Sequence, residues 1–247
     1  MEYVKLDGVV KTFGSVRAVD GLTLSVSEGE ILGFLGTNGA GKTTTIKMLL
    51  GLIPPDAGQI AVLGADPRKA ETRRRIGYMP ETAYYYPFLN VQELLQFYGG
   101  LCGMDKVTIK KRTAELLEKV GLEHAGKRQL KTYSKGMLQR AGIAQALLHD
   151  PDLLILDEPF TGLDPLARIH FRDLILELKQ AGKTVFFSSH ELSEAELICD
   201  RVAIMKEGKC VFDGAVKDIA GDGGRNLERI FLSVLTGASA SKEGGAA

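Results

Sequence analysis

The residues GTNGAGKTT at 36–44 are the feature that most constrains how this chain can fold. They fit the pattern G-x-x-x-x-G-K-[ST] and lie between an apolar run at 30–36 and a helical pattern at 42–52. Glycines in such a loop let successive backbone N–H groups point at phosphate oxygens, and the start of the helix adds a positive dipole end. This context predicts a phosphate-binding loop between a buried strand and a helix.

The residue types inside the loop suit a triphosphate. Lys42 is expected to reach the β- and γ-phosphates, and Thr43 is expected to offer a hydroxyl to Mg²⁺. The alternative is a glycine-rich turn that contains Lys-Thr by chance, which the neighbouring strand and helix patterns disfavour. The candidate nucleotide contacts are Gly36, Thr37, Asn38, Gly39, Ala40, Gly41, Lys42, Thr43 and Thr44.

Two acids follow a second apolar run, LLILDEP at 153–159. Ligands bind at the carboxyl ends of strands in α/β sheets, so Asp157 is expected beside the loop, holding Mg²⁺ through water. Glu158 can accept a proton from an attacking water or orient that water; an ordinary strand-end acid is the alternative. His190 ends a third run, FFSSH at 186–190. A lone strand-end His is usually structural, but at this edge it can contact the γ-phosphate.

Short apolar runs alternate with helical patterns, which is typical of βαβ units and a buried parallel sheet. Strand patterns stop between about 91 and 148, so a helical insertion is predicted there. The expected fold class is α/β: a mostly parallel sheet with flanking helices, an N-terminal antiparallel β element and a helical insertion. The predicted units are a domain at 1–225 (nucleotide-binding core at 1–90 and 150–225, helical subdomain at 91–149), a C-terminal helix at 226–237 and a flexible tail at 238–247.

Composition narrows the partners and the compartment. Among 247 residues, 31 Lys and Arg balance 31 Asp and Glu, so no global field favours nucleic acid, and no nucleic-acid partner is expected. Three scattered cysteines indicate reduced thiols in a cytosolic protein. The longest apolar runs are far shorter than the roughly 20 residues that a membrane-spanning helix needs. We therefore expect a chain that does not cross a membrane by itself.

Five motifs stand in a specific order: GTNGAGKTT, YSKGM, LLILDEP, TGLD and SSH. From about residue 3 to 215 the chain resembles the nucleotide-binding subunits of ATP-binding cassette (ABC) transporters, whose core is a P-loop NTPase fold. The resemblance implies a head-to-tail pair of subunits, with ATP between the phosphate loop of one and YSKGM of the other. Ser134 and Gly136 would then touch the γ-phosphate on the partner. Ser134 begins a helical pattern, and a helix N-terminus suits an anion.

The resemblance implies roles for further residues. Phe13 matches the aromatic that stacks on adenine, where most relatives carry Tyr. Asp164 matches the loop that crosses between the two sites. Glu81 stands where the family usually has Gln, which contacts Mg²⁺ and the attacking water. Glu can still coordinate metal but adds a charge, so the role of Glu81 stays open.

Glu81 and the YSKGM variant resemble those of bacterial ABC-2-type exporter ATPases. This implies an integral membrane permease as partner, a second nucleotide-binding subunit in a homodimer or heterodimer, and a place at the cytoplasmic face of the membrane. No C-terminal regulatory domain is expected. The aromatic segment at 83–99 falls where the family docks its membrane partner, and aromatic enrichment suits an interface. Half-buried loop tyrosines are the alternative.

The sequence disfavours two other classes of protein relative to a transporter motor. A soluble ABC ATPase acting on DNA or ribosomes is disfavoured, because the spacing leaves no room for a coiled-coil arm and no basic patch stands out. A P-loop small-molecule kinase is disfavoured by Glu158 and YSKGM. The transported substrate has no signal in the sequence.

Overall fold

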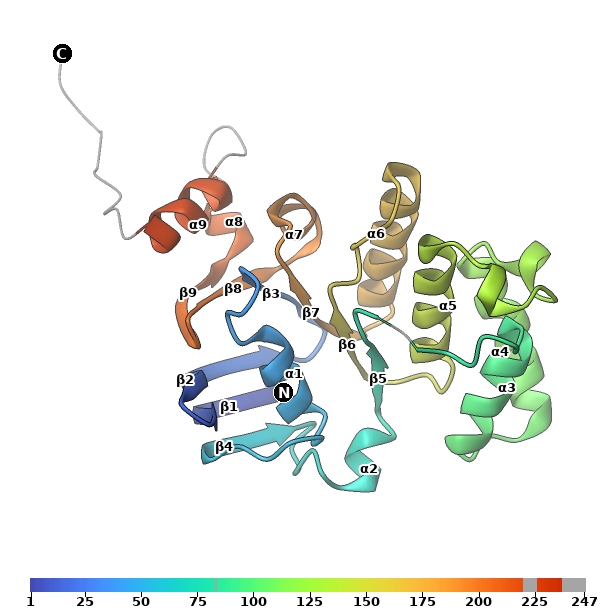
Figure 1. Ribbon diagram of the computed structural model, residues 1–247, viewed down its shortest axis with the longest axis horizontal. Coiled ribbons are helices and arrows are strands. Elements are labelled where there is room, and N and C mark those ends of the chain that lie inside the picture. Colours follow the sequence, from blue (N-terminus) through green and yellow to red (C-terminus); the bar gives the residue numbers. More distant parts are fainter. Residues whose placement is uncertain (83, 220–225, 237–247) are drawn as a thin grey trace, which may run out of the picture.

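The centre of the fold is a six-stranded sheet in the order β5-β6-β7-β3-β8-β9 (Figure 1). The computed structural model describes residues 1–82, 84–219 and 226–236. Neighbouring strands are parallel except β8 and β9, and every residue of β3, β6 and β7 is buried, as expected for parallel strands covered on both faces. The strands are β3 (Ile31–Gly36), β5 (Ile76–Met79), β6 (Leu153–Asp157), β7 (Thr184–Ser189), β8 (Arg201–Lys206) and β9 (Lys209–Ala215).

A second, antiparallel sheet covers one face of the first. Its order is β2-β1-β4, from β1 (Glu2–Phe13), β2 (Val16–Ser27) and β4 (Ala57–Val62). The helix α1 (Lys42–Leu49) shares one apolar core with this sheet and with side chains of the central sheet. Because α1 is packed between the two sheets, the loop that leads into it has a fixed position at the end of β3.

The opposite face of the central sheet is covered by helices. Alternation along β3 divides its side chains: Leu32 and Phe34 join the core around α1, whereas Ile31 and Leu35 join the core on the helical side. The helices α3 and α4 lie at the end of the molecule away from the antiparallel sheet, with α5 between them and the central sheet (Figure 1). The remaining helices are α2 (Ala70–Arg73), α3 (Val91–Leu101), α4 (Lys106–Lys119), α5 (Lys135–Leu147), α6 (Pro165–Gln180), α7 (Leu192–Ile198), α8 (Val216–Ile219) and α9 (Asn226–Thr236).

The fold class predicted from the sequence is confirmed: a mostly parallel sheet, an antiparallel N-terminal sheet and flanking helices. The helical pattern expected between 91 and 148 corresponds to α3, α4 and α5 with short 3₁₀ turns. The subdomain boundaries stay a prediction, and the tail predicted at 238–247 lies outside the described residues. Within the described ranges, no helix combines the length and the apolar character that crossing a bilayer requires.

Candidate nucleotide site

The phosphate loop occupies the turn between β3 and α1, where the sequence predicts it. Gly41 precedes α1 with a φ of 105°, a left-handed conformation that favours glycine, and a Cβ there would overlap the Ala18 carbonyl. Glycine offers no side chain to cap the helix. The first backbone N–H groups of α1 are therefore left for an anion.

This loop forms one wall of a cleft of about 550 Å³. Further walls come from the β1–β2 hairpin, of which the sequence analysis assigned only Phe13 to the site, and from the turn between β8 and β9, which it did not assign. The lining residues are Val16, Arg17, Ala18, residues 37–44, Glu81, Glu158, Glu207 and Gly208. Loop, metal candidate and candidate base thus meet in one cavity large enough for a nucleotide's phosphates.

Lys42 is buried at the start of α1, with 6% of its surface exposed. Its Nζ donates to the carbonyl of Gly36 at 2.7 Å and to that of Thr37 at 3.3 Å. The same Nζ lies 3.3 Å from Oε1 of Glu158. The amine is therefore held at the mouth of the loop, beside the carboxylate that the sequence proposes as the base.

Glu158 is buried between two partners. Its Oε2 lies 2.8 Å from Nδ1 of His190 and accepts from the His190 backbone N–H at 3.3 Å. Its own backbone N–H donates to the Ser188 hydroxyl at 3.0 Å, and its φ of 50° is left-handed. A strained backbone on a non-glycine residue is characteristic of functional sites, because surrounding contacts must hold it in place. The structure thus brings Lys42, Glu158 and His190 together.

Asp157 lies deeper, with 2% of its surface exposed. Burial raises the pKa of its carboxyl, although hydrogen bonds from Ser188 and Thr43 act in the opposite direction. The Ser188 hydroxyl donates to Oδ1 at 2.6 Å. Ser188 was missed by the sequence analysis, because a serine in a buried strand gives no pattern that separates it from packing.

The Asp157 carboxylate and the Thr43 hydroxyl are hydrogen-bonded neighbours, and both offer the hard oxygen ligands that Mg²⁺ prefers. The described residues contain no cluster of three or more His, Cys, Asp or Glu side chains that could hold a metal alone. Mg²⁺ is usually bound by one or two carboxylates together with substrate phosphates and waters. Thr43 and Asp157 therefore fit a magnesium ion that arrives with a nucleotide.

Of two further predicted contacts, Glu81 lines the cleft and Phe13 does not. Glu81 is exposed and lines the cleft, so its carboxylate faces the same space as that of Glu158. Phe13 is half exposed at the end of β1 and does not line the cleft, but its antiparallel partner Val16 does. The Phe13 ring lies 5.6 Å from Nζ of Lys11. Adenine stacking on Phe13 stays a prediction.

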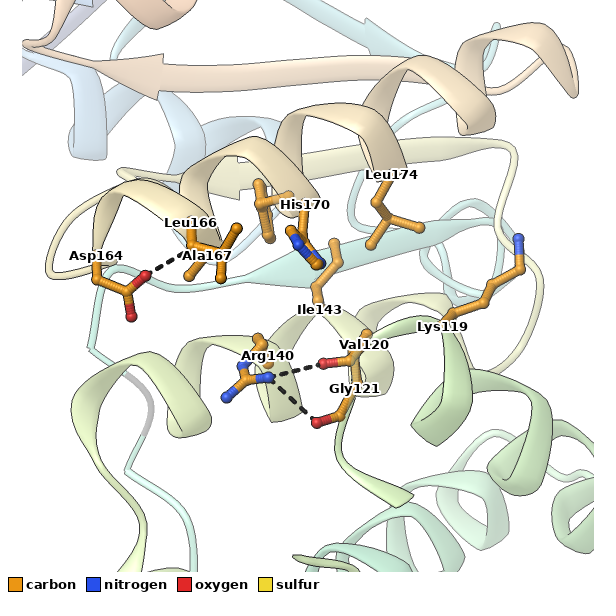
Figure 2. Close-up of a pocket in the computed structure, with 11 residues that line it drawn as sticks. Lys119, Val120, Gly121, Arg140, Ile143, Asp164, Leu166, Ala167, His170 and Leu174 are labelled. Carbon is orange, nitrogen blue, oxygen red and sulfur yellow. Dashed lines mark hydrogen bonds between the residues drawn. The ribbon is translucent and has the colours of Figure 1, made fainter. Parts of the chain in front are cut away.

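Three further predicted residues lie on a separate surface. Ser134 caps α5, its hydroxyl accepting from the Met137 N–H at 3.2 Å. Gly136 leaves room beside Leu163. Asp164 caps α6, accepting from the Ala167 N–H at 2.9 Å (Figure 2). None of these residues lines the cleft formed by the phosphate loop of the same chain.

The surface that carries Asp164 continues into a pocket of about 260 Å³ between the end of α4, α5 and α6 (Figure 2). Arg140 on α5 crosses this junction and donates to the carbonyls of Val120 and Gly121 at 3.3 and 3.2 Å. These carbonyls end α4, where a cation is favourable. Arg140 therefore connects α4 to α5. It does not line the cleft at the phosphate loop.

Residues 19–161 match the protein family described as ABC transporter. The chain belongs to this family. The family resemblance found in the sequence is thereby confirmed, and the matched range includes the phosphate loop and both Asp157, which ends β6, and Glu158, which follows it.

Several ABC transporter ATP-binding proteins are similar to this chain. An uncharacterized one from Synechocystis is 46% identical over 209 residues, covering 84% of this chain and 59% of its own length. The bacitracin transport ATP-binding protein BcrA of Bacillus licheniformis is 48% identical over 209 residues, covering 83% and 67%. The linearmycin resistance ATP-binding protein LnrL of Bacillus subtilis is 38% identical over 233 residues, covering 93% and 75%. The chain thus spans less than two thirds of the Synechocystis relative.

Solved structures that resemble this chain also belong to ABC ATP-binding proteins. An ATP-binding subunit of an ABC transporter has a TM-score of 0.85 and 31% identity, covering 94% of this chain and 99% of that one. A dimeric ATP-binding cassette in a post-hydrolysis state, bound to ADP and phosphate, has a TM-score of 0.80 and 25% identity, covering 86% and 98%.

Proposed function

We propose that this chain is the ATP-hydrolysing motor subunit of an ABC transporter, acting as an exporter through a separate membrane subunit. The observation that carries the proposal is the placement of Glu158, whose two carboxylate oxygens face Lys42 at 3.3 Å and His190 at 2.8 Å beside the phosphate loop. Such a carboxylate can orient water and accept its proton during attack on a phosphate.

The contacts of Lys42 suggest how the site responds to ATP. A triphosphate is a stronger partner for an amine than two carbonyls and one carboxylate, so Lys42 would turn to the β- and γ-phosphates. Glu158 would then be free on that side and held on the other by His190. Mg²⁺, bound near Thr43 and Asp157, would neutralise charge that develops on the phosphates.

The separate surface around Ser134 supports a second subunit. Ser134 is exposed at the N-terminus of α5, where backbone N–H groups and the helix dipole favour an anion. Since it does not line the cleft of its own chain, we propose that it completes the site of a partner subunit, in a homodimer or heterodimer. The post-hydrolysis dimer among the structural relatives supports this arrangement.

An exposed aromatic patch, defined as Tyr84, Tyr86, Phe88 and Phe97, supports docking of the membrane subunit. Their exposed fractions range from 43% for Phe97 to 93% for Tyr84. Ring centroids of Tyr86 lie 5.8 Å from those of Phe88 and 5.9 Å from those of Phe97, so these three side chains are contiguous. Large exposed aromatic groups are enriched at protein interfaces. We propose that this patch docks on the membrane subunit at the cytoplasmic face of the membrane.

ATP hydrolysis by the purified chain tests the proposal directly. Lys42→Ala is expected to abolish turnover by removing the amine at the phosphate loop, with a loss of at least about 100-fold. The control is Lys47→Ala, which removes an exposed amine from the last turn of the same helix and is expected to retain activity. Full activity of Lys42→Ala would refute the site. Co-purification with ribosomes or DNA instead of a membrane protein would refute the transporter assignment.

A further inference from the structure

Arg168, in the first turn of α6, joins two loops that carry the proposed catalytic groups. Its Nε donates at 3.3 Å to the carbonyl of Leu163, near the end of the loop that begins at Glu158. Its Nη2 donates to Oε1 of Glu191 at 2.9 Å, and its Nη1 donates to Oε2 of the same carboxylate. Glu191 directly follows His190. One planar guanidinium therefore bridges both loops.

The geometry of this contact favours positioning over simple stabilisation. A guanidinium that meets both oxygens of a carboxylate fixes orientation as well as distance, which a lysine amine cannot do. Arg168 and Glu191 are partly buried, with side-chain exposures of 28% and 23%. A bidentate pair of this kind can also stabilise the fold, so a test of positioning must separate the two effects. The contact sets where Glu191 lies.

Both bridged loops are short and directly connected to the reacting groups. The Thr161 N–H donates to the Glu158 carbonyl at 3.1 Å, which closes the first loop into a turn. The Glu191 N–H donates to the Ser189 hydroxyl at 2.9 Å, which closes the second. Glu158 begins the first loop and His190 directly precedes Glu191 in the second, so a shift of either loop is expected to change the contact between Glu158 and His190. Misplacement of a catalytic group by 1 Å can cost about 100-fold in rate.

We propose that Arg168 is a positioning residue for ATP hydrolysis, holding the loop that begins at Glu158 against the segment that carries His190. The proposal rests on the proposed function, because the readout is the rate of ATP turnover. It assigns no contact between Arg168 and nucleotide, since Arg168 does not line the cleft. Its loss should therefore affect the chemical step and leave ATP binding intact.

The test compares Arg168→Met with Arg172→Met. Methionine keeps the aliphatic stem and removes the guanidinium. Arg172 is a matched control, because it lies one turn further along α6 and its Nε approaches only Glu194, at 3.9 Å. Arg168→Met is expected to lower kcat by about 10-fold to 100-fold, with an unchanged KM for ATP. Arg168→Lys keeps the charge and should fold in any case. Its kcat is expected to lie between those of Arg168→Met and Arg172→Met.

Hydrogen exchange of the backbone at 189–194 gives a second readout that needs no turnover. Arg168→Met is expected to raise exchange there, whereas Arg172→Met is expected to leave it near that of the unchanged protein. Equal kcat values for the two variants, or unchanged exchange in Arg168→Met and Arg168→Lys, would overturn the proposal. If the unchanged protein hydrolyses no ATP, the proposed function fails, and the exchange measurement alone decides whether Arg168 holds this segment.

Discussion

The backbone of Glu158 is strained at the position where its carboxylate meets Lys42 and His190. Its left-handed φ of 50° costs on the order of 1 kcal/mol or more for a non-glycine residue. The contact of its N–H with Ser188 and of its carboxylate with Lys42 and His190 offset that cost. Leu63, Asp150 and Glu207 share this backbone conformation, so it is the contacts with Lys42 and His190 that distinguish Glu158.

Asp157 provides a stability test at the residue scale. Because burial raises the pKa of its carboxyl above the ordinary value of 3.8, the ionised form destabilises the fold. This penalty is fully present above the raised pKa and disappears as the pH falls below 3.8. Asp157→Asn removes the charge and keeps the shape. Without nucleotide and magnesium at pH 7, its melting temperature is expected to be at or above that of the unchanged protein.

The same variant should lose at least about 100-fold in ATP hydrolysis, because the proposed magnesium ligand is gone. Asp152→Asn is the matched control at the other end of the same strand segment, where Asp152 Oδ2 lies 2.5 Å from Nε of Arg75. It is expected to keep its activity and to gain no stability. A lower melting temperature for Asp157→Asn than for Asp152→Asn would contradict this explanation of the raised pKa.

The sequence predicts a site residue best when that residue follows a strand of the parallel sheet. Lys42, Asp157 and Glu158 follow buried strand runs, and the carboxyl ends of neighbouring parallel strands meet at one edge. Ser188 was not predictable, since only the folded structure shows which hydroxyl of FFSSH faces Asp157. Arg168 was not predictable either, because α6 and α7 must pack before it can reach Glu191.

Among the elements, α5 gives the most specific prediction about dimer formation. Its N-terminus is capped by Ser134 and exposed, while the helix beyond it is largely buried. An arginine at position 134 would fill the space that a partner's γ-phosphate would occupy. Ser134→Arg is therefore expected to keep ATP binding by the single chain and to abolish ATP-dependent dimers, as measured by equilibrium binding and sedimentation.

Asp105→Arg separates this effect from loss of a helix cap. Asp105 caps α4, accepting from the N–H groups of Val107 and Thr108. Both substitutions should cost about 1 kcal/mol of stability through the lost cap, but only Ser134→Arg should prevent dimers. If Ser134→Arg also removed ATP binding from the single chain, action on a partner would be the wrong explanation.

Element boundaries were predicted best where one periodicity dominates. The helical insertion predicted between 91 and 148 corresponds to α3, α4 and α5. The N-terminal antiparallel element was predicted without strand bounds, and in the structure it consists of β1, β2 and β4. Several register irregularities between β1 and β2 interrupt the alternation that identifies a strand. The exposed half of that hairpin consequently gave no clear pattern.

For the whole molecule, the aromatic patch predicts where a membrane subunit binds. Tyr84→Ser combined with Phe88→Ser is expected to reduce co-purification with that subunit several-fold, because two exposed apolar contacts are lost. ATP hydrolysis by the isolated chain should be unaffected. The control is Leu52→Ser combined with Val107→Ser, two exposed apolar residues outside the patch. Equal losses in both double variants would exclude the patch as the docking surface.

How two subunits would pair cannot be predicted from the sequence patterns of one chain. The motif order implied a subunit pair, but pairing depends on surface shape, which follows from how α5, α6 and the central sheet are packed. The separation of Ser134 from the cleft of its own chain is the structural property that gives the pairing a physical reason.

The most direct test of the account is sedimentation of Glu158→Gln with ATP and Mg²⁺. Glutamine keeps the shape of the side chain and removes the proposed base, so hydrolysis is expected to fall by about 100-fold to 10,000-fold while ATP still binds. ATP should then hold a dimer that the unchanged protein forms only transiently, and adding Ser134→Arg should dissolve it. Full retained hydrolysis, or a chain that stays monomeric with ATP bound, would contradict the account.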